Sequence, residues 1–246
     1  MKMKLVLLLV PVLLLLGCGA VNQAIEIDDG SVVEGSLSTV NGPIRIGKDC
    51  EINGSVSNVN GSVQVGDNSS TGSISNVNGS ISLGAGSRST QLDTVNGSLT
   101  LGDAAQISGN ARTVNGRITG GKEVRVGGNL GTTNGSLQLG QDSRVEGSVS
   151  TVNGNITLHA SYIGSLETFT GSVQLLDGST IDGELKVRKP NRLPRETPRI
   201  VIGENSRVVG PLVFEHEVEL YIHESAEVGE ITGADPEFYS GEAPGR

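Results

Sequence analysis

Aromatic residues are nearly absent from this 246-residue sequence, which has three tyrosines, three phenylalanines and no tryptophan. An ordinary globular core of this size relies on bulky aromatic side chains, so such a core is not expected. Proline is scarce and the 36 glycines do not recur at every third position, which excludes collagen. Long amphipathic helix patterns are also missing, which argues against a doubly wound nucleotide-binding domain. The regular recurrence of valine, isoleucine and leucine argues against general disorder.

The first 18 residues resemble the signal of bacterial lipoproteins. Lys2 and Lys4 give a short basic start, and residues 5–16 form a 12-residue apolar run that is too short to cross a bilayer as a helix. The run ends in Leu15-Leu16-Gly17-Cys18, which is similar at all four positions to the lipoprotein cleavage motif. An ordinary signal peptide followed by a chance cysteine is the alternative.

This resemblance implies that residues 1–17 are removed and that Cys18 becomes lipidated, with diacylglyceryl and amide-linked acyl chains such as palmitate. Several acyl chains on one residue anchor a protein stably without a spanning helix. Gly19 rather than aspartate follows the cysteine, and the sorting rule of the family then implies the outer membrane. We therefore expect the membrane to be a partner of this protein, through the N-terminal acyl chains. Residues 18–24 would form the lipidated N-terminus and a short spacer.

Negative charge dominates the remaining chain. Removal of residues 1–17 leaves 16 basic and 27 acidic residues, a net charge of −11. This charge argues against nucleic acid as a partner and against charge-driven binding to anionic lipid. Cys50 then has no intramolecular cysteine partner, so no disulfide framework is expected. We expect Cys50 to be a small buried side chain, and an intermolecular disulfide is the alternative.

One unit repeats along most of the chain. The dipeptide Asn-Gly recurs at steps of 18 or 19 residues, with asparagines at Asn41, Asn60, Asn78, Asn96, Asn115, Asn134 and Asn153. A column of glycines, most of them flanked at two residues on each side by apolar residues, runs with a similar period from Gly35 to Gly229. A third pattern, apolar-x-apolar-Gly, follows most Asn-Gly pairs, as at Ile44-Arg45-Ile46-Gly47. Three columns in one register define about eleven coils of 18–19 residues.

The repeating unit predicts an all-β fold. Short stretches of alternating apolar residues, separated by glycine or Asn-Gly corners, are typical of strands and tight turns. Such units bury their apolar side only by stacking on one another. The sequence therefore predicts a parallel β-helix, a three-faced β-solenoid of roughly 50 Å, with a right hand favoured. An array of hairpins is the alternative, since Asn-Gly is also a strong hairpin turn.

The asparagine column has a structural interpretation in this fold. Stacked coils place equivalent asparagines about 4.8 Å apart, where their amides can form a hydrogen-bonded ladder. We assign the seven asparagines to such a corner ladder rather than to a ligand row or to glycosylation. His216 follows Gly210 by six residues, as Asn41 follows Gly35, so the sequence predicts that His216 occupies the same corner.

The repeat also sets the expected boundaries. We expect the solenoid to occupy residues 25–232. One step is 27 residues long, and its surplus falls in a segment rich in proline and arginine, so a protruding loop is expected at 188–199. The pattern is lost after residue 232, and residues 233–246 are expected to form an irregular tail.

The coil resembles that of the bactofilins, bacterial cytoskeletal proteins that form polymers. The resemblance is carried by stretches such as Gly140 to Val149 and Gly203 to Leu212, in which a glycine and small polar residues precede apolar-x-Gly-x-apolar. It covers about residues 25–232. It implies a right-handed β-helix that assembles end to end into a homo-oligomer or polymer. The lipoprotein signal and the stronger Asn-Gly column distinguish this chain from that family.

Candidate catalytic and metal-binding groups do not cluster in the sequence. The three histidines, His159, His216 and His223, lie apart, although glutamates surround His216. We expect no catalytic site, no metal and no cofactor. The sequence favours a non-enzymatic, lipid-anchored structural or scaffolding protein of the cell envelope. A surface adhesin or glycan-binding module is the alternative, and a polysaccharide-active β-helix enzyme is the third hypothesis.

Overall fold

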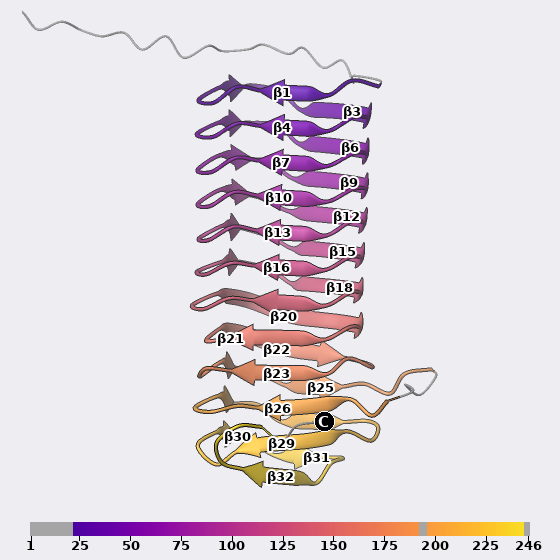
Figure 1. Cartoon of the computed structure of the whole chain (residues 1–246), viewed down its shortest axis with the longest axis vertical. Coiled ribbons are helices and arrows are strands. Elements are labelled where there is room, and N and C mark those ends of the chain that lie inside the picture. Colours follow the sequence, from indigo (N-terminus) through magenta and orange to yellow (C-terminus); the bar gives the residue numbers. More distant parts are fainter. Residues whose placement is uncertain (1–21, 192–195, 244–246) are drawn as a thin grey trace, which may run out of the picture.

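The structure, a computed structural model, describes residues 22–191 and 196–243. The predicted signal peptide, Cys18 and the first part of the spacer lie outside the described residues. Every regular element in the described ranges is a β-strand, and the strands stack into a solenoid of about 11 turns (Figure 1). The predicted fold class is therefore confirmed.

Each coil contributes strands to three faces. Face 1 is a 12-stranded sheet with the strands β1 (Ile25–Ile27), β4 (Ile44–Ile46), β7 (Val63–Val65), β10 (Ile81–Leu83), β13 (Leu99–Leu101), β16 (Ile118–Gly120), β19 (Leu137–Leu139), β21 (Ile156–His159), β23 (Val173–Leu176), β26 (Arg199–Ile202), β29 (Glu219–His223) and β32 (Pro236–Tyr239). The other strands belong to a second sheet of 20 strands, which bends around a corner and so supplies the two remaining faces.

Face 2 consists of two-residue strands. They are β2 (Val32–Val33), β5 (Glu51–Ile52), β8 (Ser70–Thr71), β11 (Arg88–Ser89), β14 (Gln106–Ile107), β17 (Arg125–Val126), β24 (Thr180–Ile181), β27 (Arg207–Val208) and β30 (Glu227–Val228).

Face 3 has five-residue strands that end at the asparagine of Asn-Gly in the first six coils, and shorter strands without this dipeptide in the last three. They are β3 (Leu37–Asn41), β6 (Val56–Asn60), β9 (Ile74–Asn78), β12 (Leu92–Asn96), β15 (Ala111–Asn115), β18 (Leu130–Asn134), β25 (Leu185–Val187), β28 (Leu212–Phe214) and β31 (Ile231–Thr232). Two strands, β20 (Arg144–Asn153) and β22 (Tyr162–Thr168), run through faces 2 and 3 without a break.

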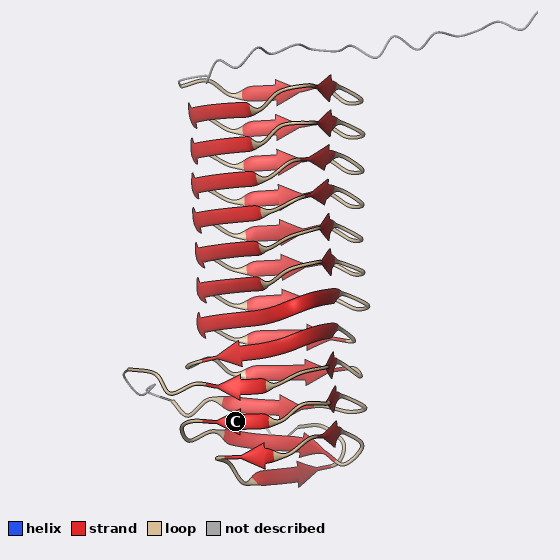
Figure 2. Cartoon of the chain, turned by 180° about the vertical axis from the view of Figure 1, so that it is seen from behind, coloured by secondary structure: helices blue, strands red, loops and turns tan. Residues whose placement is uncertain are grey.

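Neighbouring coils pair in parallel, one repeat apart. Ile25 pairs with Ile44 on face 1, and Asn41 pairs with Asn60 on face 3. Every strand pairing in the described ranges has this parallel sense, which excludes the hairpin array. In Figure 1 the chain runs leftward along face 1 in front and returns rightward along face 3 behind, while it descends (Figure 2 shows face 3). This motion describes a right-handed coil.

The core is a narrow stack of aliphatic side chains. On face 1 the apolar-x-apolar pattern points two residues inward and one outward, so Ile44 and Ile46 are buried while Arg45 is exposed. Equivalent positions in successive coils lie directly above one another, and the stacked columns form one continuous hydrophobic cluster. Stacking of short branched side chains explains how the chain builds a core with few aromatics.

The predicted loop leaves the solenoid without disturbing its register. β25 ends at Val187 and β26 begins at Arg199, and Val173 on the preceding coil pairs with Ile200. Part of the loop, residues 192–195, lies outside the described residues. The predicted boundary was one residue too long, because the backbone N–H of Arg199 already joins face 1 by donating to Ser172 Oγ at 3.1 Å.

The prediction of an irregular tail is wrong for its central part. Residues 236–239 form β32, which pairs with β29 through Leu220 and Pro236. Proline is tolerated at the first position of an edge strand, where its missing N–H removes little pairing. The sequence signal failed here because the strand has neither the glycine nor the asparagine that mark the other coils.

Replacing Lys189–Pro198 with the dipeptide Asn-Gly should preserve the fold. The replacement leaves the same seven-residue step from Leu185 to Ile200 that separates Leu37 from Ile44, and it restores the usual corner. We expect the β-sheet circular dichroism to be retained and the thermal midpoint to be equal to or above that of the original chain. Loss of the β signal would show that the loop residues set the register.

Candidate functional site

The asparagine side chains at the end of face 3 form a continuous ladder. The Nδ2 atom of each asparagine donates to Oδ1 of the asparagine one coil earlier, at 2.8–2.9 Å for the six bonds from Asn60 to Asn153. All the amides therefore point in the same direction along the solenoid. The structure brings all seven predicted residues together, and their exposed position makes the ladder part of the molecular surface.

The ladder extends further than the sequence pattern indicated. Asn41 Nδ2 donates to Oδ1 of Asn22, which has no glycine after it and was therefore not recognised as a corner. At the other end, Thr170 Oγ1 donates to Asn153 Oδ1 at 2.9 Å and ends the asparagine series. His216 does not join it, because its Nε2 lies 2.8 Å from the carbonyl oxygen of Phe169 instead.

A buried column behind the ladder secures the corner backbone. Thr113 Oγ1 donates to the carbonyl oxygen of Gly97 at 2.8 Å, and Thr132 Oγ1 donates to that of Gly116 at 2.9 Å. Each bond joins one coil to the corner glycine of the coil before it. The same contact to a corner glycine recurs through Asn58, Asn76, Thr94 and Thr151, and Thr39 donates in the same way to the carbonyl oxygen of Gln23. This column was not predicted from the sequence, although its residues lie two positions before the asparagine of each Asn-Gly pair.

Replacing Asn58 with threonine should raise the free energy of unfolding by about 1–2 kcal/mol. Asn58 Oδ1 is buried without a hydrogen-bond partner, whereas its Nδ2 donates to the carbonyl oxygen of Gly42. Threonine keeps the donor and removes the unsatisfied oxygen. The reverse change, Thr113→Asn, should lower stability by a similar amount. Urea unfolding of both variants checks this, and equal midpoints would contradict it.

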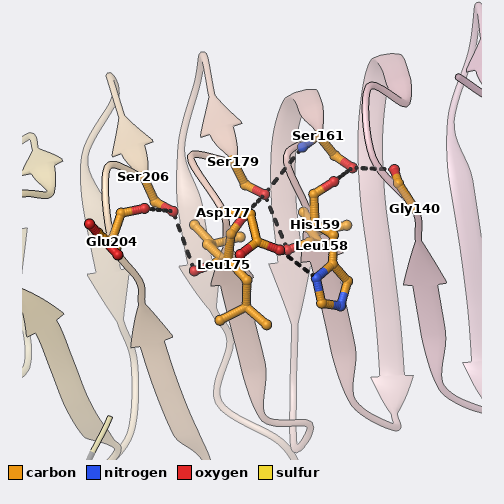
Figure 3. Close-up of polar contacts among 10 residues, drawn as sticks. Gly140, Leu158, His159, Ser161, Leu175, Asp177, Ser179, Glu204 and Ser206 are labelled. Atoms are coloured by element: carbon orange, nitrogen blue, oxygen red, sulfur yellow. Dashed lines mark hydrogen bonds and ion pairs between the residues drawn. The ribbon is translucent and has the colours of Figure 1, made fainter. Parts of the chain in front are cut away.

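A second buried column lies at the turn between faces 1 and 2. Ser161 Oγ donates to the carbonyl oxygens of His159 and Gly140, and its backbone N–H donates to Ser179 Oγ at 3.2 Å (Figure 3). Cys50 occupies the equivalent position in its coil and is 2% exposed. Its backbone N–H donates to Ser69 Oγ at 3.0 Å, and its thiol donates to the carbonyl oxygen of Asp28. Cys50 is thus a buried structural side chain, as predicted.

Charged side chains pair on the exterior between neighbouring coils. Lys48 Nζ lies 3.0 Å from Asp67 Oδ2. Their hydrogen bond raises the pKa of Lys48, and it lowers the pKa of Asp67 together with the backbone N–H of Ala85. Both groups are exposed, so water screens the pair and it adds little to stability.

The histidines occupy three separate places. His159 Nδ1 lies 2.8 Å from Oδ2 of Asp177 on the next coil (Figure 3), and His223 Nδ1 lies 2.8 Å from Ser225 Oγ near the end of the solenoid. Within residues 22–191 and 196–243, no group of three or more histidine, cysteine or acidic residues could hold a metal ion. The same residues include no helix long and apolar enough to cross a membrane.

Comparisons with protein-family models, with curated proteins and with solved structures give no match for this chain. The fold is therefore known from its own geometry, and the resemblance to bactofilins stays a prediction. The features that can act on other molecules are the regularly repeated outer columns, above all the exposed side of face 3 with its asparagine ladder.

Proposed function

We propose that this protein is a non-enzymatic scaffold of the bacterial cell envelope, anchored in the outer membrane by acyl chains on Cys18. The observation that carries the proposal is the unbroken asparagine ladder, which runs in one register from Asn22 to Thr170. A solenoid tied together by continuous backbone pairing and side-chain ladders is a stiff rod with a repetitive exterior. Such a rod suits a spacer or scaffold.

The position of the first ladder residue supports anchoring close to the membrane. Only three residues separate Asn22 from Cys18 in the sequence. A fully extended chain of four residue steps spans about 14 Å at most. The base of the rod would therefore be held near the lipid headgroups, and a rigid rod in that position presents its faces in a defined orientation.

End-to-end self-assembly is a further part of this proposal. Phe238 on β32 continues the inner column of Ile202 and Ile222, yet its side chain is 63% exposed in the described chain. The unpaired edge of β32 exposes backbone groups that can accept another strand. A second copy stacked on this end would bury the phenylalanine and satisfy that edge.

Lipid attachment can be tested by fractionating envelopes and measuring the mass of the purified protein. The proposal predicts that the chain sediments with outer membranes and carries acyl chains on an N-terminal Cys18. Cys18→Ser should abolish acylation and retain the uncleaved signal, whereas the matched control Cys50→Ser should be lipidated normally. A mature, unacylated chain that begins at another residue would contradict the proposal.

A second candidate function, glycan binding, is favoured by a polar cavity of about 410 Å³ beside the loop before β26. Asn155, Ser172 and Arg199 line it, and two guanidinium nitrogens of Arg199 are buried without a hydrogen-bond partner. Acidic oligosaccharides would supply acceptors for such groups. Binding on a glycan array that is lost in Arg199→Ala would support this candidate, and an array without binding would remove it.

A further inference from the structure

A column of exposed valines runs along the outside of face 3, beside the asparagine ladder. The side chains of Val40, Val59, Val77, Val95 and Val114 are 38–41% exposed. Thr133 and Val152, which are partly buried, continue the column, so it spans seven coils. Among the described residues, only Val209 and Phe238 are other large hydrophobic side chains with comparable exposure. The exposed apolar surface is thus concentrated in one straight stripe, which we call the valine stripe.

The neighbouring outward column is made of small residues with two charges in its middle. Its members are Ser38, Ser57, Ser75, Asp93, Arg112, Gly131 and Ser150. Asp93 and Arg112 lie on adjacent coils and form an exposed ion pair, with 3.4 Å between Oδ1 and Nε. A shallow cavity of about 520 Å³ lies over the central coils, where Gly131 has no side chain. The face is therefore flat, lightly charged and partly apolar.

We propose that the valine stripe is an interface with a second copy of this chain. The two rods lie antiparallel, related by a two-fold axis that runs along the strands between β12 and β15. This axis places the coil of Val95 opposite the coil of Val114 in the second copy, and it places Asp93 opposite Arg112. Valine then faces valine or threonine over the inner coils, and opposite charges meet twice at the centre.

Charge complementarity selects this arrangement over a parallel one. If the axis ran along the rods, each coil would face its own equivalent, so Asp93 would lie at the level of Asp93 and Arg112 at the level of Arg112. Like charges in close apposition are unfavourable. In the antiparallel arrangement Asp93 of each copy lies opposite Arg112 of the other, and these two attractive pairs steer association and fix the register. The positions of Asp93 and Arg112 on adjacent coils at the middle of the stripe make the face self-complementary.

The size of the face predicts a weak, reversible dimer. Seven coils at about 4.8 Å and five residues at about 3.3 Å give roughly 550 Å² per copy, or about 1,100 Å² in total. This area is at the lower end of specific interfaces, so we expect a dissociation constant on the order of 10 µM. Membrane anchoring, which rests on the proposed function, would raise the local concentration of copies and favour pairing.

Charge reversal and complementation test the interface directly. The full chain carrying Phe238→Asp, which removes the proposed end-to-end contact, is purified in detergent and studied by sedimentation equilibrium, so that neither that contact nor a membrane contributes to the association. We expect Asp93→Arg and Arg112→Asp each to weaken dimerisation at least about tenfold. An equimolar mixture of the two variants should form heterodimers again, because each charge then meets its opposite. A mixture that stays monomeric would overturn the proposal.

Two further variants separate the stripe from general surface effects. Val114→Lys should abolish the dimer, whereas Val209→Lys, at an exposed valine that is 47% accessible but outside the stripe, should leave it unchanged. Because all these side chains are exposed, we expect each variant to keep the solenoid intact. Thermal unfolding of each variant checks this. Monomeric original protein at about 200 µM would also overturn the proposal. Acylation of Cys18 is measured separately. A failed test of the interface therefore leaves the test of membrane anchoring valid, and the reverse also holds.

Discussion

Replacing Gly116 with alanine is expected to lower the free energy of unfolding by about 3 kcal/mol or more. A Cβ atom on Gly116 would lie 2.0 Å from the carbonyl oxygen of Gly97 and 2.5 Å from its carbonyl carbon. The backbone of Gly97 cannot move away, because it is packed just as closely against the coil before it. A Cβ atom on Gly97 would lie 2.0 Å from the carbonyl oxygen of Gly79. The cost arises from close approach of the coils, since Gly116 does not have a positive φ.

Chemical denaturation of the variant and of a matched control measures this effect. Arg117→Ala changes the next, exposed residue and should alter the free energy of unfolding by less than about 0.5 kcal/mol. If Gly116→Ala and Arg117→Ala unfold at the same denaturant concentration, the coils are further apart at this corner than the structure shows.

Cutting the asparagine ladder in its middle should have the second-largest effect. The double replacement of Asn96 and Asn115 by alanine removes three consecutive amide hydrogen bonds, those joining Asn78 to Asn96, Asn96 to Asn115 and Asn115 to Asn134. At about 1 kcal/mol for each bond, the loss in the free energy of unfolding is about 2–4 kcal/mol. Each single replacement removes two bonds, so the singles should sum to more than the double.

An exposed asparagine outside the ladder provides the control. Asn53 makes one long contact of 3.3 Å with Glu34, and Asn53→Ala should change stability by less than about 0.5 kcal/mol. Thermal midpoints of the double variant, the two single variants and Asn53→Ala measure these differences in stability. A double variant as stable as Asn53→Ala would show that the asparagines are retained for their corner geometry alone.

The coil and its corners could be predicted from the sequence because every copy repeats the same local chemistry. Asn-Gly specifies a turn, apolar-x-apolar-Gly specifies a half-buried strand, and the constant step forces the copies to stack. The loop predicted at 188–199 was placed for the same reason, since the pattern resumes in phase after it. The right hand was only favoured from the sequence, and the three-dimensional path of the chain was needed to establish it.

The inward and outward sides of face 3 were harder to assign. Hydropathy alone would bury Val40 and expose Thr39, whereas the structure buries Thr39 and exposes Val40. The period of two from the buried Leu37 forces this outcome, and Thr39 is needed inside because its hydroxyl bonds a corner carbonyl of the adjoining segment. Counting alternate positions from each inward leucine or isoleucine would have revealed both the threonine column and the valine stripe.

The ends of the solenoid escaped prediction because they depart from the repeat. Asn22 lacks its glycine and is identified as part of the fold by its side-chain hydrogen bond with Asn41, whereas β32 lacks every corner residue and is identified by its backbone pairing with β29. His216 has the expected spacing, yet the loop before β26 removes the neighbouring corner and lets its ring reach Phe169. Spacing therefore predicted the place of this residue but not its partner.

Electron microscopy of the lipidated full chain on outer-membrane vesicles tests the scaffold account most directly. The account predicts straight rods of roughly 50 Å attached to the vesicle surface, with pairs that lie side by side and disappear in Val114→Lys. Cys18→Ser should leave the vesicles bare. Compact particles without a rod shape, or rods that bind the vesicles equally well without Cys18, would contradict it.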